Sequence, residues 1–450
     1  MGTYSDLVIP VDPDPPEAPP QRGFIDPRHA WHVRAVLQVA RVLGEKVLNI
    51  ENALEQNVER TPDREQKVAS AVKLMAERGQ LKLGDYALDE FGALVAAELF
   101  GLGPLDRFLD SPDVSEIMVN GPYVLFIERK GKLTETGHKF LDDEHVERII
   151  RRITSRIGRT VGPDSPLVDA RLPDGSRVNA AVAPCTLDGP SLTIRKFSRR
   201  KLTLNDLMNF GAMSPNMGEF LSAIVKARRN IVVAGGTGSG KTTLINALSH
   251  HIPNGERVVT IEDAAELQLS QRNVVRMESK KPTFDNPAQV TIRDCLVNAL
   301  RMRPERILIG ECRSSEALDM LQAMNTGHDG SMTTVHANTP RDTVSRLETL
   351  ALMSGIDLPV SVIRKQIASA VHFIVQVSRL RDGSRRITHI TEVQGMEGEI
   401  VVLGDIFLFV EEGMRGDKIV GKYKGGGNRP KCIEDIERHG IRLAPQMFFG

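Results

Sequence analysis

The sequence lacks several features that mark whole classes of protein. No run of about 18 apolar residues occurs, so no transmembrane helix is expected. The N-terminal segment has no basic stretch followed by an apolar one, so no secretory signal is expected. The four cysteines form no CxxC pair, which argues against a disulfide framework or structural zinc and suits a reducing cytoplasm. Aromatic residues make up only 4%, and Lys+Arg equals Asp+Glu at 58 each. Base-stacking platforms are therefore scarce, and coating of nucleic acid is disfavoured.

The composition that remains is that of an ordinary globular protein. Hydrophobic residues make up 41% and charged residues 26% of the chain, which excludes collagen-like, mucin-like and fully disordered proteins. A length of 450 residues suggests roughly two to three domains.

The first part of the chain is expected to be disordered and then helical. Residues 1–27 contain seven prolines and few large apolar residues, so they are predicted to be a flexible tail or, alternatively, a docking peptide. Residues 28–84 are predicted to form a helical bundle, which is either structural or a partner-docking module. The second and third helices of this part are predicted from Pro62 to Gly79 and from Asp85 to Phe100. An apolar repeat of about 3.5 residues predicts one long first helix, and its members are Val33, Val36, Ala40, Leu43, Val47, Ile50 and Leu54.

An α+β domain is predicted over 85–200, followed by a linker at 201–209. Two apolar runs between 115 and 133, separated by a turn signal, predict strands, and 142–157 has the pattern of an amphipathic helix. A hairpin over 168–184 and a strand in 191–197 complete the predicted domain.

The last part, 210–450, has the pattern of an α/β domain. Strands rich in Val and Ile alternate with helices of about ten residues, which predicts a largely parallel sheet covered on both faces. The predicted strands are 230–234, 257–261, 306–309 and 331–335, and the predicted helices are 241–251, 291–302 and 315–325. Later strands at 373–380, 387–394 and 400–410 are separated by short turns and are expected to be antiparallel.

The strongest motif is a glycine-rich loop between a predicted strand and a predicted helix. Its sequence, GGTGSGKT, fits G-x-x-x-x-G-K-[ST], and such glycines let successive N–H groups turn toward a triphosphate. Lys241 would reach the β- and γ-phosphates, and Thr242 offers a hydroxyl ligand to Mg²⁺. ATP and Mg²⁺ are therefore the expected ligands. The predicted nucleotide-binding residues are Gly235, Gly236, Thr237, Gly238, Ser239, Gly240, Lys241, Thr242 and Thr243.

Hydrolysis also requires a carboxylate near the metal and a group that orients water. Glu262, Asp263 and Glu266 follow one predicted strand, and Glu311 follows another. Functional groups gather at the carboxyl ends of strands in open α/β sheets, so these acids are expected to converge on the loop. For Glu262 and Asp263 the alternative is a surface salt bridge.

Two histidines flank the predicted strand 331–335. His328 and His336, beside Thr333 and Thr334, are candidates to contact the γ-phosphate or report its loss. No third ligand lies nearby in the sequence, so a metal site at these histidines is disfavoured.

These segments together resemble the secretion ATPase superfamily, whose members power type II and type IV secretion, type IV pili and archaeal flagella. The resemblance rests on the loop, the acidic run 260–266, the strand ending in Glu311 and the histidine segment 327–338. The segments DARLPDGSRVN (169–179) and SLTIRKF (191–197) narrow the resemblance to the CpaF/TadA-type assembly ATPases of Flp (tight adherence) pili. This resemblance covers roughly residues 85–445. The resemblance implies a homo-hexamer with an α/β fold: a RecA-like P-loop ATPase domain preceded by a small α+β domain and an N-terminal helical bundle.

The resemblance also implies roles for the acids. Glu266 matches the proposed catalytic glutamate that orients water, and Glu262 is the alternative. Glu311 matches the Walker B acid, so Thr242 and Glu311 are the candidate Mg²⁺ ligands, Glu311 either directly or through water.

Histidine and arginine roles are implied in the same way. His336 matches the His-box residue, with His328 secondary. Arg171, Arg177 and Arg195 fall where the family places an arginine-rich interface, so they are candidate arginine fingers for the γ-phosphate. The alternative is that they are exposed hairpin charges. ATP would clamp the two domains together through these arginines, and hydrolysis would release them.

The implied function is that of a cytoplasmic ATPase, peripheral at the inner membrane, that drives assembly of a Flp pilus through inner-membrane platform proteins. Whether the same motor also retracts the pilus stays open. No direct nucleic-acid partner and no integral membrane segment are expected. The alternatives are a motor for type IV secretion of DNA or protein and a nucleotide-gated scaffold with little turnover.

Overall fold

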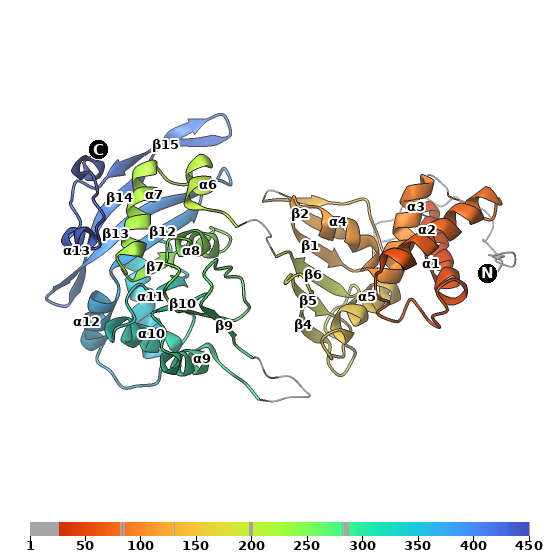
Figure 1. Ribbon diagram of the computed structural model, residues 1–450, viewed down its shortest axis with the longest axis horizontal. Helices are drawn as coiled ribbons and strands as arrows, with labels where there is room; N and C mark the ends of the chain where they lie inside the picture. Colours follow the sequence, from red (N-terminus) through yellow and green to blue (C-terminus); the bar gives the residue numbers. More distant parts are fainter. Residues whose placement is uncertain are drawn as a thin grey trace. The chain divides into compact units, whose positions relative to one another are not determined.

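The computed structural model describes residues 27–449 apart from 82, 84–85, 130, 198–200, 281 and 283–287. The chain divides into two units, Met1–Ser198 and Arg199–Gly450 (Figure 1). Residues 1–26 of the predicted tail lie outside the described residues. Within the described ranges, no helix combines the length and apolar character that crossing a membrane requires.

Three helices open unit 1. They are α1 (Pro27–Lys46), α2 (Pro62–Glu77) and α3 (Leu88–Phe100). Thr61 caps α2 by accepting a hydrogen bond from the backbone N–H of Arg64, and Gly79 follows α2 with a φ of +67°. These are the start and stop that the sequence predicts. Apolar residues of all three helices form one buried cluster.

The prediction of one long first helix reaching Leu54 is wrong. α1 ends at Lys46, and Asn49 adopts a left-handed φ of 55° that turns the chain back. A Cβ atom on Gly44 would lie 2.4 Å from the Cβ of Ala53, so the glycine makes room for the returning segment. The apolar repeat outlasts the helix because Ala53 and Leu54 enter the same core from a turn.

A six-stranded antiparallel sheet forms the rest of unit 1, in the order β3-β2-β1-β6-β5-β4. Helix α5 (Asp143–Ser155) packs its apolar side into the core of this sheet. A short 3₁₀ turn (Gly103–Leu105) and α4 (Asp106–Asp110) precede the first strand. The strands are β1 (Val114–Asn120), β2 (Leu125–Arg129), β3 (Lys132–Glu135), β4 (Leu167–Arg171), β5 (Arg177–Ala181) and β6 (Ser191–Arg195).

A buried group of charges joins the helices of unit 1 to α5. Glu98 of α3 is 4% exposed, and its carboxylate lies 3.0 Å from His145 Nε2 and accepts a hydrogen bond from Arg148 Nη2 at 2.9 Å. Burial opposes ionisation of Glu98, but His145 and Arg148 outweigh it and hold the pKa of this carboxyl below its usual range. Arg152 donates to the backbone carbonyl of Glu98 at 2.8 Å. Charges that are paired inside the protein therefore join α3 to α5, the helix that packs on the sheet.

Unit 2 is built on a nine-stranded sheet in the order β15-β14-β13-β12-β7-β11-β10-β8-β9. The neighbouring strands β12, β7, β11, β10, β8 and β9 pair in parallel, whereas β12, β13, β14 and β15 pair antiparallel with one another in turn. This confirms the predicted α/β class. The strands are β7 (Ile231–Ala234), β8 (Val258–Glu262), β9 (Val274–Glu278), β10 (Arg306–Ile309), β11 (Met332–Val335), β12 (Phe373–Arg379), β13 (Arg385–Glu397), β14 (Ile400–Arg415) and β15 (Lys418–Gly425).

Helices cover both faces of this sheet, as predicted (Figure 1). Ile231 and Val233 of β7 face α7, α8 and α13, whereas Val232 and Ala234 face α9 to α12. Residues 201–209, predicted as a linker, include the short helix α6. The helices are α6 (Leu204–Asn209), α7 (Pro215–Lys226), α8 (Lys241–Ser249), α9 (Ile292–Ala299), α10 (Glu316–Asn325), α11 (Pro340–Leu352), α12 (Val360–Ala370) and α13 (Ile433–Arg438).

Candidate active site

The glycine-rich loop connects β7 to α8 at the carboxyl edge of the parallel strands. Gly238 and Gly240 have φ values of +68° and +101°, which glycine adopts without steric strain. At Gly235 the restriction is space, because a Cβ atom there would lie 2.3 Å from the carbonyl oxygen of Val377 on β12. The backbone of the loop therefore requires glycine at three positions.

Lys241 begins α8 and is almost buried, with 8% of its surface exposed. Its Nζ donates to the carbonyls of Gly235 and Gly236 at 2.9 and 3.0 Å and lies 3.5 Å from Nε2 of His336. Burial lowers the pKa of Lys241. The ammonium is thus held inside the loop, beside the free N–H groups of the first turn of α8, where anions bind.

The other predicted loop residues differ in how far they are exposed. Ser239 is buried and donates through Oγ to the carbonyl of Gly236 at 2.9 Å, which stabilises the turn. Thr237 is exposed, while Thr242 and Thr243 are half-buried in the first turn of α8. Both threonines therefore lie at the N-terminal end of α8, where the glycine-rich motif is expected to bind phosphate.

Charged side chains from the segments that follow β8, β10 and β11 meet next to Lys241. His336 Nε2 lies 2.8 Å from Glu311 Oε1. Arg313 donates to Glu311 Oε2 at 2.6 Å and to Asp263 Oδ2 at 3.5 Å. Burial, followed by the nearby Lys241, lowers the pKa of His336, whereas the hydrogen bond to Glu311 raises the pKa of Arg313. The predicted convergence of Glu311 and His336 at the loop is what the structure contains.

Arg313 and Arg385 are site residues that sequence reasoning missed. Arg313 follows Glu311 by two positions, so a basic residue close after a strand-ending acid was an available signal. Arg385 donates through Nε to the carbonyl of Gly238 at 2.8 Å. It belongs to β13, and nothing in the local sequence links that strand to the loop.

The two glutamates of the run 260–266 have different surroundings. Glu262 is 3% exposed, and its Oε1 accepts hydrogen bonds from the backbone N–H groups of Glu266 and Leu267 at 2.8 and 3.0 Å. Burial raises the pKa of Glu262 despite these two bonds. Glu266 is half-buried. The surface alternative is therefore wrong for Glu262, which holds the loop that carries Glu266, whereas Asp263 is exposed and pairs with Arg313.

His328 lies at the opposite edge of the sheet. β11 runs parallel to β7 with Met332 beside Ile231 and Val335 beside Ala234, so the start of β11 is far from the loop. His328 precedes this start, and its Nδ1 lies 3.3 Å from the carbonyl oxygen of Ala323. Of the two candidate γ-phosphate contacts, the structure therefore brings His336 to the loop and keeps His328 away from it, because β11 lies between the two histidines.

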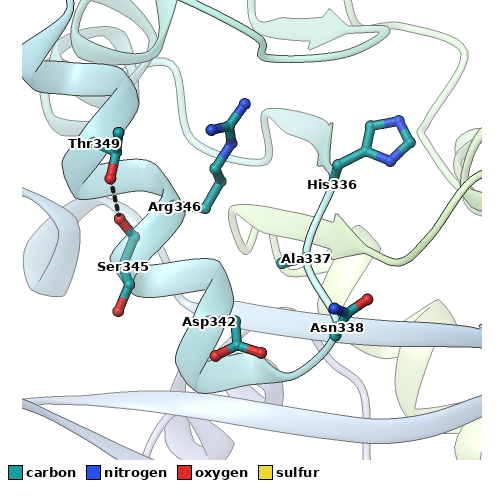
Figure 2. Close-up of a pocket in the computed structure, with 7 residues that line it drawn as sticks. All are labelled: His336, Ala337, Asn338, Asp342, Ser345, Arg346 and Thr349. Atoms are coloured by element: carbon teal, nitrogen blue, oxygen red, sulfur yellow. Dashed lines mark hydrogen bonds between the residues drawn. The ribbon is translucent and has the colours of Figure 1, made fainter.

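A pocket of about 310 Å³ lies beside His336, between the segment after β11 and α11. Figure 2 shows Arg346 of α11 and His336 bordering this space from two sides. Arg346 is one of the cations that lower the pKa of His336. The pocket is lined by His336, Ala337, Asn338, Asp342, Ser345, Arg346 and Thr349.

The three predicted arginines lie together in unit 1. Arg171 of β4 is opposite Arg177 of β5, which is opposite Arg195 of β6. Arg195 continues the row to Glu116 of β1 and donates to its Oε1 at 2.8 Å. Residues directly opposite in neighbouring strands share a face of the sheet, so the three guanidinium groups form one basic row.

Among the described residues, no group of three or more His, Cys, Asp or Glu side chains is arranged to hold a metal ion on its own. Mg²⁺ in phosphate sites is commonly held by one or two protein oxygens together with phosphate oxygens and waters. Thr242, which follows Lys241 in the first turn of α8, and the Glu311 carboxylate, whose charge acts on Lys241, fit that pattern.

The chain is similar to several known proteins. An uncharacterized protein of Methanocaldococcus jannaschii is 45% identical over 240 residues, which cover 51% of this chain and 33% of that protein. The chain thus spans about a third of the length of that relative. A putative conjugal transfer protein of Mycobacterium tuberculosis is 33% identical over 324 residues, covering 71% of this chain and 92% of that protein. Among solved structures, the VirB11 ATPase from the Brucella suis type IV secretion system, in complex with sulphate, is 32% identical and covers 64% of this chain and 95% of its own, with a TM-score of 0.35.

A family profile covers most of the chain. The profile described as Type II/IV secretion system protein (T2SSE) matches residues 98–400. This range includes the glycine-rich loop, the arginine row and the acids and histidines around Lys241. The match exceeds half of the 450 residues, and the chain therefore belongs to the Type II/IV secretion system protein family.

Proposed function

We propose that this protein is a magnesium-dependent ATPase that works as a homo-hexameric motor. One observation carries the ATPase assignment: Lys241 Nζ, His336 Nε2 and Glu311 Oε1 are linked by successive distances of 3.5 and 2.8 Å beside the glycine-rich loop. The hexamer is proposed from the family resemblance alone. A cation, an imidazole and a carboxylate are thereby assembled where a bound triphosphate would end.

The loop and α8 would bind the phosphates. The loop N–H groups and the positive end of α8 attract the anion, and Lys241 would leave its two carbonyl partners to pair with the β- and γ-phosphates. Thr242 and Glu311 would hold Mg²⁺, which supplies charge neutralisation between the phosphates when bound.

The residues beside the γ-phosphate would act on water and on charge. Glu266 would orient the attacking water, and His336 would report whether the γ-phosphate is present. Arg313 would fix the Glu311 carboxylate, to which it donates at 2.6 Å. The arginine row of unit 1 would neutralise charge that develops on the γ-phosphate, as arginine fingers do.

Steady-state hydrolysis tests this activity. The purified chain should release phosphate from ATP only with Mg²⁺, and Lys241→Ala should lower kcat/KM by about a hundredfold or more, since it removes the central cation. Equal turnover by Lys241→Ala and by the unchanged chain would refute the assignment. High nucleotide affinity with almost no turnover would instead favour the scaffold alternative.

We further propose that the motor drives assembly of a Flp-type pilus through inner-membrane platform proteins, at the cytoplasmic side of that membrane. The segments 169–179 and 191–197 support this, because they are the ones that resemble the Flp subgroup. The second candidate is a type IV secretion motor, which the similarity to the mycobacterial putative conjugal transfer protein favours.

Deletion of the gene separates the two candidates. Loss of surface pili with conjugation and effector export unchanged supports the first, and the reverse result supports the second. Complementation with Lys241→Ala, which should not restore the lost process, ties the phenotype to the nucleotide.

A further inference from the structure

We infer that Asn246 of α8 is a positioning residue that sets the place of Glu266 relative to the phosphate loop. The inference rests on the proposed ATPase function and deepens it. It starts from the segment after β8, residues 263–273, which has no helix or strand to fix its backbone.

Side chains bind the backbone of this segment instead. Four successive N–H groups, those of residues 265 to 268, donate to side-chain oxygens of Glu278, Glu262 and Asn246 at distances from 2.8 to 3.1 Å. Backbone groups in folded proteins must find partners, and here three side chains supply all four. The conformation around Glu266 therefore depends on these side chains.

Asn246 makes two of the contacts nearest to Glu266. Its Oδ1 accepts from the N–H of Gln268 at 2.8 Å, and its Nδ2 donates to the carbonyl of Glu266 at 3.4 Å. Glu262 holds the N–H of the same Glu266 at 2.8 Å. The peptide group before Glu266 is thus held by Glu262 of β8, and the peptide group after Glu266 is held by Asn246 of α8.

The place of Asn246 on α8 links this loop to the phosphate site. Thr242 and Asn246 are four residues apart on one helix, so they lie on the same face, about 6 Å apart along its axis. A rigid helical turn consequently relates the loop of Glu266 to the hydroxyl that would bind Mg²⁺. Displacements of about 1 Å at a catalytic group can cost about a hundredfold in rate.

Gln271 is the matched control, because it ties the same segment to the far end of α8. Its Nε2 donates to the carbonyls of Ser249 and Ile252 at 2.7 and 2.9 Å, and it is 6% exposed. A merely structural role would give Asn246 and Gln271 the same kinetic effects.

The experiment measures kcat, KM, nucleotide affinity with a fluorescent ATP analogue, and thermal stability of Asn246→Ala, Asn246→Asp and Gln271→Ala. Asn246→Ala should lower kcat about 10- to 100-fold with affinity within about twofold. Gln271→Ala should lower the unfolding temperature at least as much but keep kcat within about twofold. Asn246→Asp, which keeps the acceptor for Gln268 and loses the donor to Glu266, should fall between Asn246→Ala and the unchanged chain.

A double variant tests whether Asn246 acts through Glu266. If it does, adding Asn246→Ala to Glu266→Gln should lower kcat no further, because coupled residues are not additive. An undiminished effect in the double variant, equal kinetics for Asn246→Ala and Gln271→Ala, or an unchanged kcat would each overturn the inference. Failure of the proposed function looks different, since the unchanged chain would then lack magnesium-dependent turnover.

Discussion

His336 and Glu311 are held 2.8 Å apart between their ring nitrogen and carboxylate oxygen, although 24 residues separate them in the chain. They follow β11 and β10, which pair in parallel with Ile309 beside Thr333. A neighbouring hydrogen bond of 2.7 Å from Thr334 Oγ1 to the carbonyl of Gly310 closes the two strand ends together. The same ring nitrogen of His336 thus lies 2.8 Å from the Glu311 carboxylate and 3.5 Å from the ammonium of Lys241.

His336→Ala should lower turnover by about 10- to 100-fold while ATP affinity changes little, because the histidine contacts charge that changes during the reaction. The lowered pKa of His336 keeps its ring neutral at pH 7. Turnover should therefore be insensitive to this residue's protonation above about pH 6.5 and fall at lower pH. Single-turnover rates measured from pH 5 to 8 check this, and an acid limb that survives unchanged in His336→Ala would exclude the residue as its source.

Gly235→Ala should destabilise unit 2, whereas Gly236→Ala should not. A Cβ on Gly235 would meet the Val377 carbonyl oxygen at 2.3 Å, but a Cβ on Gly236 has no neighbour within 4 Å among the described residues. Backbone oxygen cannot move aside cheaply, so a cost of about 1–3 kcal/mol is expected for Gly235→Ala. Chemical denaturation of both variants measures this, and equal unfolding midpoints would contradict the close approach.

Arg195→Ala should leave ATP binding nearly intact and lower turnover by about 10³-fold or more, as loss of an arginine finger does. Arg129→Ala is the control, because Arg129 is exposed at the end of β2 in the same sheet. Phosphate release and nucleotide titration, run on both variants, separate binding from turnover. Equal losses of turnover in Arg195→Ala and Arg129→Ala would mean that the arginine row contributes only its overall positive charge.

The stability of unit 2 should fall as the pH drops from about 6.5 to about 4, in part because of His372. Burial, then the nearby Arg229, lowers the pKa of His372 from 6.5 to about 4, against the opposing charges of Asp329 and Asp435. The unfolded chain therefore binds this proton first, so the stabilisation is complete above pH 6.5 and is lost as the pH falls, by up to about 3 kcal/mol.

His372→Asn should flatten this dependence. His372 Nδ1 accepts the backbone N–H of Asn230 at 2.9 Å, and an asparagine oxygen offers a similar acceptor without a titration in this range. The exposed His439 provides the control substitution, His439→Asn. Urea unfolding at pH 7, 6, 5 and 4.5 measures the slope, and identical slopes for the His372→Asn variant and the unchanged chain would contradict the assignment.

Local patterns predicted much of the fold because local rules govern those parts. Pro62 and Gly79 bound α2 through their own backbone preferences, and Arg306–Ile309 forms β10 with the predicted bounds. The elements that were not predicted are the strands β3, β9 and β15 and the helices α4, α6, α7, α11, α12 and α13. The long first helix was wrong because its repeat continued into a turn that shares the core.

The sequence by itself determined that a phosphate loop lies between a strand and a helix, because glycine conformations and the register of Lys241 and Thr242 are properties of adjacent residues. The tertiary structure alone decided that Arg385 and Asn246 touch that site and that His328 does not. Strand order decides which strand ends become neighbours, and therefore which of the residues that follow them come together. Strand order itself follows from how apolar faces pack over the whole unit. No local pattern encodes that packing.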